Sequence, residues 1–284
     1  MTTPAIAALE PRKAEAGRGW DWFVEAVGLF RQSPGIWIGI CLVYVVIIIA
    51  ASAVPGASLL TTLFGPVFSG GLILACASQD AGTGVRIEHL FAGFRGSHFG
   101  QLVLLAVLYL GAILALVIVG AILAIAVLGL SPSHLDVMRS DPTQYFLPML
   151  LLITVLFGLF IPVMMGMWLA PALIALRNIG PVDAFKLSFK ACMVNWAPLL
   201  IYGLVVLLVP FVIAIPVGII WAASSSAGLT AIVGFILLVL FMVFAMPVAF
   251  ISIYTAYRDM FPMPPPPPPV DFNATQPLPV PPPL

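Results

Sequence analysis

Four long stretches of this chain contain no Asp, Glu, Lys or Arg, and they constrain the fold more than any motif does. They lie between Arg31 and Asp80, Arg95 and Asp136, Asp141 and Arg177, and Lys190 and Arg258, and are 48, 40, 35 and 67 residues long. A helix needs about 20 apolar residues to cross about 30 Å of hydrocarbon. The first and last stretches therefore have room for two spans each and the middle two for one each, which predicts six transmembrane helices.

The composition excludes a soluble globular protein. Hydrophobic residues make up 62% of the chain and charged residues only 8%, whereas a soluble domain has about half and a quarter. Too few charges remain to coat a water-facing surface. The sequence therefore predicts an all-α fold, a polytopic membrane helical bundle. The net charge of zero gives no indication of nucleic-acid binding.

The predicted spans divide the chain into three regions. They fall at about 36–54, 58–78, 102–127, 146–173, 198–221 and 229–253. Together they form a membrane domain of residues 19–260. Residues 1–18 are predicted to be a flexible cytoplasmic N-terminus, and residues 261–284 a Pro-rich, disordered cytoplasmic tail.

The basic residues fall almost entirely on one side of the predicted membrane. Ten of the eleven lie before the first span or after the second, fourth and sixth, and the exception is Arg139, after the third. Cytoplasmic segments carry the excess of Lys and Arg in membrane proteins. Both termini are therefore predicted to be cytoplasmic.

The segments before the odd-numbered spans resemble one another. Residues 87–95 and 182–190 both begin with an aliphatic and an acidic residue and end with Phe and a basic residue, and Val24-Glu25 opens the same way before the first span. Their apolar residues share one face, which is typical of amphipathic helices lying in the headgroup plane. Gly93 and Gly96 weaken the second copy as a helix. The sequence thus predicts three interfacial helices.

Each even-numbered span carries a Pro-Val step, at Pro66, Pro162 and Pro247. Proline kinks a helix because it removes a backbone donor and clashes with the preceding turn. The unit is then an interfacial helix followed by a transmembrane hairpin, repeated three times. The alternative is chance similarity between short apolar motifs.

Seven residues are candidates for contact with lipid at the interface. The basic ones would contact headgroups, and the aromatic ones would lie at the acyl boundary, where Trp is enriched. They are Arg31, Arg95, Lys186, Lys190, Trp20, Phe185 and Phe189.

Two stretches support a resemblance to a known group of proteins. They are Gly19-Trp20-Asp21-Trp22 with Phe30, Pro34 and Trp37, and Met167-Trp168-Leu169-Ala170-Pro171 running into Asp183 to Phe189. Over residues 18 to 260 the chain resembles an uncharacterised family of proteobacterial inner-membrane proteins. More distantly, the repeat is similar to the membrane domain of glycerophosphodiester phosphodiesterases, whose soluble catalytic domain has no counterpart here. The resemblance implies a bacterial inner membrane and no known activity.

The predicted spans contain no Asp, Glu, Lys, Arg or His. Because ionisable groups inside a membrane usually serve function, their absence argues against proton pumps, proton-coupled carriers and intramembrane metalloenzymes. His89, His98 and His134 are not at metal-ligand spacing, and HExxH, GxSxG and P-loop motifs are missing. We therefore expect no catalytic residue, metal or cofactor, and the prediction is a protein that is not an enzyme.

The acids Glu25, Glu88 and Asp183 recur at one position of the repeat. They could together bind a cation or an amine headgroup. Alternatively each acid has a local role, such as an ion pair between Asp183 and Lys186 three residues later or a favourable charge in the first turn of a helix.

The tail contains six consecutive prolines, Pro264 to Pro269. Such a segment favours polyproline II. It is either a docking strip for an aromatic groove of a protein partner or a stiff extension without a partner.

Two functions remain. The first is a non-enzymatic organiser of membrane partners or lipids, and the alternative is a carrier for a neutral or amphipathic, lipid-like molecule along the kinked spans. A polar cavity lined by Tyr44, Tyr109, Tyr202 or Tyr254 would favour the carrier, and a closed apolar bundle would favour the organiser.

The topology can be tested by cysteine labelling in sealed cells. An introduced cysteine near Ser133 should react with an impermeant reagent added from the periplasmic side, because the basic residues place that loop outside. Cysteines near Ser97 or Asn178 should stay unlabelled. Labelling at position 97 would overturn the six-span topology.

Overall fold

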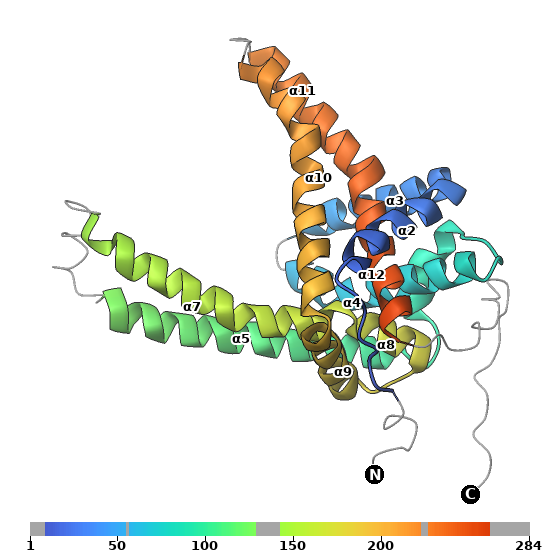
Figure 1. The fold of residues 1–284 in the computed structure, drawn as a ribbon, viewed down its shortest axis with the longest axis horizontal. Helices are drawn as coiled ribbons and strands as arrows, with labels where there is room; N and C mark the ends of the chain where they lie inside the picture. Colours follow the sequence, from blue (N-terminus) through green and yellow to red (C-terminus); the bar gives the residue numbers. More distant parts are fainter. Residues whose placement is uncertain (1–8, 55–56, 129–142, 223–226, 262–284) are drawn as a thin grey trace, which may run out of the picture.

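The computed structural model describes residues 9–54, 57–128, 143–222 and 227–261, and every regular element in these ranges is a helix (Figure 1). The elements are α2 (Arg18–Gln32), α3 (Pro34–Ser52), α4 (Ala57–Asp80), η1 (Ile87–Phe94), α5 (Phe99–Leu128), α7 (Thr143–Trp168), α8 (Ala170–Arg177), α9 (Pro181–Val194), α10 (Trp196–Ala222), α11 (Ala227–Leu240), η2 (Phe241–Ala245) and α12 (Met246–Met260). The Pro-rich tail lies outside the described residues.

Four helical stretches are long and apolar enough to cross a membrane: Pro34–Ser52, Leu60–Asp80, Phe99–Val127 and Tyr145–Arg177. A fifth is added if α9 and the first part of α10 count as one span, although they meet at an angle of 88°. The described residues thus confirm an all-helical protein with four to five candidate spans. Six spans stay a prediction.

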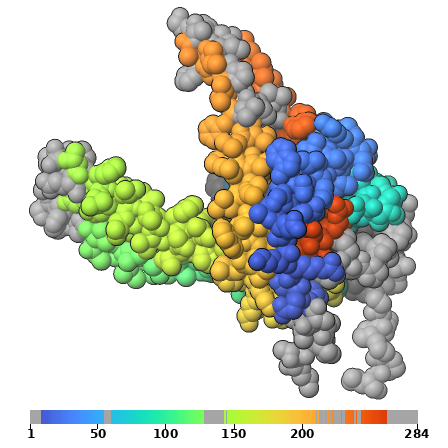
Figure 2. Space-filling model, in the orientation of Figure 1, coloured from blue at the N-terminus to red at the C-terminus, as the bar shows by residue number. Residues whose placement is uncertain are grey.

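The C-terminal half of α4, α8 and α12 meet in one buried core, which we call the hub. Its largest fully buried side chains include Ile73 from α4, Leu173 from α8, and Tyr254 and Tyr257 from α12. Two pairs of helices extend away from the hub. Figure 1 shows α5 and α7 running side by side in one direction, and α10 and α11 in another. In the space-filling view of Figure 2 the α5–α7 pair is a separate arm.

Each amphipathic segment packs against an even-numbered predicted span. η1 lies on α4, α9 lies on α7, and α2, the first helix described, lies on α12, the last. Two of these helix pairs are joined by hydrogen bonds from a side-chain hydroxyl to a backbone carbonyl. The Ser188 hydroxyl donates to the Met165 carbonyl at 2.6 Å, and the Thr255 hydroxyl donates to the Trp22 carbonyl at 2.8 Å.

The second amphipathic segment is a 3₁₀ helix, not an α-helix. Gly93 explains how closely it approaches α4, because a Cβ at this position would lie 1.9 Å from the Val67 carbonyl oxygen. At its start the Arg86 amide donates to His89 Nδ1 at 3.0 Å, which fixes the first turn. The weak helical signal from Gly93 and Gly96 thus has a packing cause.

The fourth predicted span, 146–173, is interrupted where α7 ends at Trp168 and α8 begins at Ala170. At the break the Leu169 amide donates to the Ser188 hydroxyl at 3.0 Å, and Pro171 lies in the first turn of α8. Proline is tolerated there because those amides have no intrahelical partner. The side chain from α9 thus satisfies the backbone group that the break frees.

The three repeat prolines have different surroundings. Pro66 and Pro162 lie inside α4 and α7, whereas Pro247 lies in the first turn of α12, directly after the π-helical turn η2. A π-helical turn absorbs a proline within a long helix by shifting the hydrogen-bond register. The sixth predicted span is therefore α11, η2 and part of α12 in succession.

The N-terminal segment, predicted to be a flexible extension, forms hydrogen bonds with the rest of the protein within residues 9–17. Asn195, which is fully buried, accepts from the Ala14 amide at 2.7 Å and donates to the Arg12 carbonyl at 3.0 Å. The Arg12 amide donates to the Met260 carbonyl at 2.8 Å. This segment therefore joins the α9–α10 bend to the end of α12. Residues 1–8 lie outside the described ranges.

Replacing Gly93 by alanine should destabilise the protein. The added Cβ would overlap the Val67 carbonyl oxygen, and overpacking against backbone costs about 1–3 kcal/mol or more. The measurement is thermal unfolding of the purified variant in detergent. Gly28→Ala is the control, because Gly28 is exposed within α2 with open space around it. Its stability should be unchanged or slightly higher. Equal melting temperatures for both variants would contradict this packing.

Candidate functional site

A chain of ion pairs connects α2, the end of α4 and α12. Arg258 donates from Nη1 to both carboxylate oxygens of Asp80, at 2.8 and 2.9 Å, and from Nη2 to Glu25 at 2.6 Å. Arg18 donates to Asp259 at 2.8 Å and to the other oxygen of Glu25 at 3.0 Å. Glu25 therefore lies between two guanidinium groups.

Two buried aromatic side chains extend this network into the hub. Trp22 donates from Nε1 to Asp259 at 2.9 Å, and Tyr254 donates its hydroxyl proton to Asp80 at 2.9 Å. Burial by itself would raise the pKa of Asp259, but the hydrogen bonds from Arg18 and Trp22 outweigh it and hold that pKa below its ordinary value. Asp259 therefore stays ionised at neutral pH, and the network holds α2 against α12.

Two of the three recurring acids lie beside cations. Glu25 lies between Arg18 of the same helix and Arg258 of α12, and Glu88 lies 3.5 Å from Arg86. In the part of the chain that the structure describes, no group of three or more His, Cys, Asp or Glu side chains is placed to hold a metal ion. The contacts of Glu25 and Glu88 favour separate ion pairs over a shared cation site.

The predicted interfacial residues lie at several places on the surface. Trp20 is exposed on α2, opposite the buried face that includes Trp22, and its ring lies 6.1 Å from that of Phe23. Arg31 and Arg95 are exposed at the ends of α2 and η1. The structure does not gather these residues into one site.

On α9, Lys186 and Lys190 are exposed, and Lys190 forms an ion pair with Glu10. Phe189 is half-buried. The ring of Phe185, which is half-buried, lies directly over Gly166 of α7, and its contact with lipid stays a prediction. A glycine in the facing helix thus accommodates this ring within the protein.

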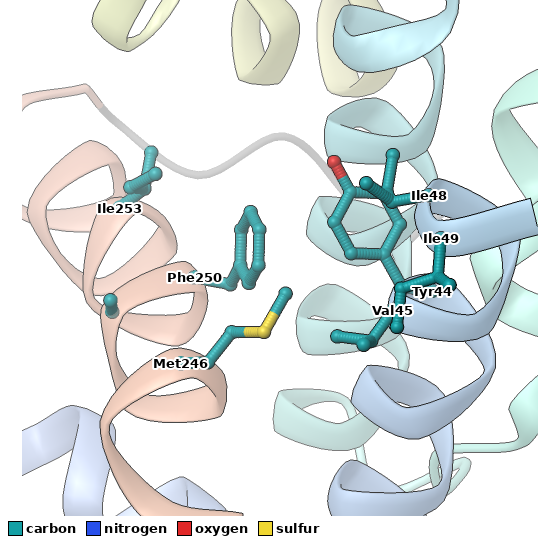
Figure 3. Close-up of a pocket in the computed structure, with 8 residues that line it drawn as sticks. Tyr44, Val45, Ile48, Ile49, Met246, Phe250 and Ile253 are labelled. Atoms are coloured by element: carbon teal, nitrogen blue, oxygen red, sulfur yellow. The ribbon is translucent and has the colours of Figure 1, made fainter. Parts of the chain in front are cut away.

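An apolar groove of about 490 Å³ lies between α3 and α12. Figure 3 shows Tyr44 and Phe250 extending toward each other from the two helices. Their rings meet edge to face, with centroids 6.0 Å apart and an angle of 84° between the ring planes. Phe68 packs edge-on against Tyr44 at 5.4 Å. The lining residues are Tyr44, Val45, Ile48, Ile49, Met246, Ala249, Phe250 and Ile253.

A second apolar groove, of about 600 Å³, lies within the α5–α7 arm. Its lining residues are Ile113, Leu116, Val117, Gly120, Ile153, Leu156, Phe157 and Phe160. None of these side chains is polar.

Two of the tyrosines that could line a polar path are engaged in hydrogen bonds. Tyr254 contacts Asp80, and the Tyr202 hydroxyl lies 2.5 Å from that of Ser252. Of the four candidates, only Tyr44 lines either of the two grooves. Both grooves thus differ from the polar cavity that would favour a carrier.

Sequence reasoning missed the ion-pair chain and the α3–α12 groove. The available signal was the position of Asp80 and Arg258 at the edges of the charge-free stretches, where each ends a predicted span. Their pairing across 178 residues leaves no local pattern. The groove also brings together residues about 200 positions apart, so no repeating pattern in the sequence could predict it.

Comparison with known proteins supports the membrane assignment. The chain is 27% identical over 204 residues to a "probable inner membrane protein" of Burkholderia thailandensis, a match that covers 68% of this chain and 73% of that protein. No protein-family model and no solved structure matches the chain. This similarity and the apolar helices support a multi-pass inner-membrane protein. They give no support to the link with glycerophosphodiester phosphodiesterases.

Replacing Arg258 by methionine should destabilise the protein by about 1–3 kcal/mol, because it leaves the partly buried carboxylate of Asp80 without its cation and Glu25 with Arg18 alone. The measurement is the free energy of unfolding in detergent. Lys186→Met, at an exposed position on α9, is the matched control and should have little effect. Equal losses for the two variants would show that the ion-pair chain contributes nothing specific.

Proposed function

We propose that this protein has six spans, with both termini cytoplasmic, and that three repeated units close in a ring around the hub. Each unit would be an amphipathic segment followed by a hairpin. The contacts of η1 with α4, α9 with α7, and α2 with α12 support this arrangement, because each segment packs on the last helix of the unit before it. In such a ring, the packing of α2, from the first unit, on α12, from the last unit, would close the ring.

The burial pattern of the amphipathic segments supports the repeat. When the copies are aligned from Val24, Ile87 and Val182, the third and seventh residues are buried in all three. These residues are Ala26, His89 and Ala184 at the third position and Phe30, Gly93 and Ser188 at the seventh. In the α-helices α2 and α9, two buried positions four residues apart lie on one face, whereas η1 buries the same two positions in a 3₁₀ helix. Burial of the same two positions in all three segments supports a repeat over a chance similarity between apolar motifs.

As the function, we propose a non-enzymatic organiser of membrane lipids. The observation that carries this proposal is the α3–α12 groove, which is apolar and opens to the side of a candidate span. Arg258, the charged residue that follows the groove residues of α12, is paired with Asp80. The protein would then interact with the bilayer through the shape and the apolar side chains of this groove, not through a reactive group. A partner of the Pro-rich tail remains a further prediction.

The alternative is a carrier for a lipid-like molecule. One observation favours it: the groove borders η2 and Pro247, where the helix departs from α-helical geometry. Irregular helices frame substrate sites in many transporters. A change in the bend at this point would alter the separation of α3 and α12.

Reconstitution into liposomes distinguishes the two functions. The organiser should retain phospholipid through purification in mild detergent and should not speed the exchange of a fluorescent phospholipid between leaflets. Protein-free liposomes and liposomes with heat-denatured protein are the controls. Protein-dependent exchange well above both controls would contradict the organiser and support the carrier.

A further inference from the structure

We propose that the α3–α12 groove binds one acyl chain of a bilayer phospholipid. This inference deepens the proposed function and rests on it, since it names the ligand and the residues that hold it. The argument depends on where the groove opens, on its size and on the side chains that line it.

The groove opens where bilayer hydrocarbon is expected. Its α3 side belongs to the candidate span Pro34–Ser52, of which only 17% is buried inside the protein. Ile49, which lines the groove, is 62% exposed, and the neighbouring Val46 is 63% exposed. The groove is therefore continuous with the outer, lipid-facing surface of α3.

The α12 side shows a division between hub and groove. Val248 and Ile251 are buried in the hub, whereas Met246, Ala249, Phe250 and Ile253 line the groove. The spacing of three and four residues places these four side chains on one face of the helix. One face of α12 thus contributes to the core and the other is left to line the groove.

The size of the groove favours a flexible chain over another helix. A helix about 10 Å wide that rises 5.4 Å per turn occupies roughly 420 Å³ per turn. The groove, at about 490 Å³, would therefore admit only about one turn. A long acyl chain is thinner and can lie along the groove beside the contacting Tyr44 and Phe250 rings.

The lining also excludes a charged or strongly polar ligand. It contains no ionisable acid or base and no amide side chain, and the Tyr44 hydroxyl is its single polar side-chain group. A buried polar ligand without hydrogen-bond partners would be penalised. Burial of methylene groups against aliphatic and aromatic side chains, in contrast, is favourable through close packing.

Ala249 is the position at which the groove can be filled. It is exposed and lines the groove, so a larger side chain there would enter the groove and not the hub. Ile49→Trp fills the same space from α3 and provides a second variant if Ala249→Trp fails to fold. Ala50→Trp is the matched control, because Ala50 is exposed on α3 but does not line the groove.

The test is photolabelling in liposomes with a diacyl phospholipid that carries a diazirine within one acyl chain, followed by peptide mass spectrometry. In the unmodified protein, residues 44–49 and 246–253 should be labelled more than outward-facing positions on α5 such as Ile118 and Ile122. Ala249→Trp should reduce labelling of the groove about tenfold through lost chain contacts. Labelling of the α5–α7 arm serves as an internal reference and should not change, nor should any labelling in Ala50→Trp.

Two results would overturn the inference. One is that the groove residues are labelled no more than the outward-facing residues of α5, or that labelling of the groove is unchanged in both Ala249→Trp and Ile49→Trp. The other is groove labelling by a photoreactive free fatty acid that excess phospholipid does not compete away. If phospholipid is still retained on purification while the groove is unlabelled, the groove assignment fails and the organiser function stands. If leaflet exchange is observed while the groove is labelled, the organiser function fails and the site stands.

Discussion

Close contact between the amphipathic segments and the helices of the even-numbered predicted spans, through the backbone of one partner or the other, is the constraint on which this structure depends. Gly93 lies against the Val67 carbonyl, Ser188 binds the Met165 carbonyl, and Thr255 binds the Trp22 carbonyl. Between helices surrounded by lipid there is little hydrophobic driving force, so small residues, close packing and hydrogen bonds drive association. These contacts hold α2, η1 and α9 around the hub.

The ion pairs follow from the same arrangement. Once α2 lies along α12, Arg18 and Arg258 lie among the carboxylates of Glu25, Asp80 and Asp259. Charges near a membrane boundary are costly unless they are paired, and here each is paired across elements distant in the chain. The charged groups thus stabilise the hub, while the arms and the α3–α12 groove present apolar surface. This separation of charged and apolar surfaces is the physical basis of the proposed role in holding lipid.

Much of the fold class could be predicted from the sequence, because charge-free stretches of 35 to 67 residues have few alternatives to membrane helices. The details that could not be predicted from the sequence depend on tertiary contacts. η1 is a 3₁₀ helix in which Gly93 permits close approach to α4, and α7 ends at Trp168 where Ser188 accepts from the Leu169 amide. Residues 9–17 are held by Asn195, a residue whose polar role only the fold reveals. The candidate lipid groove joins α3 to α12, so local patterns could not indicate it.

Closure of the ring by the packing of α2 on α12 is the central claim, and a double-mutant cycle between Arg18 and Asp259 tests it most directly. Their side chains are 2.8 Å apart although they are separated by 241 residues. The measurement is the free energy of unfolding of Arg18→Ala, Asp259→Ala and the double variant in detergent. Contact predicts a coupling energy of about 0.5–3 kcal/mol. Additive effects, within about 0.3–0.5 kcal/mol, would contradict the closed ring.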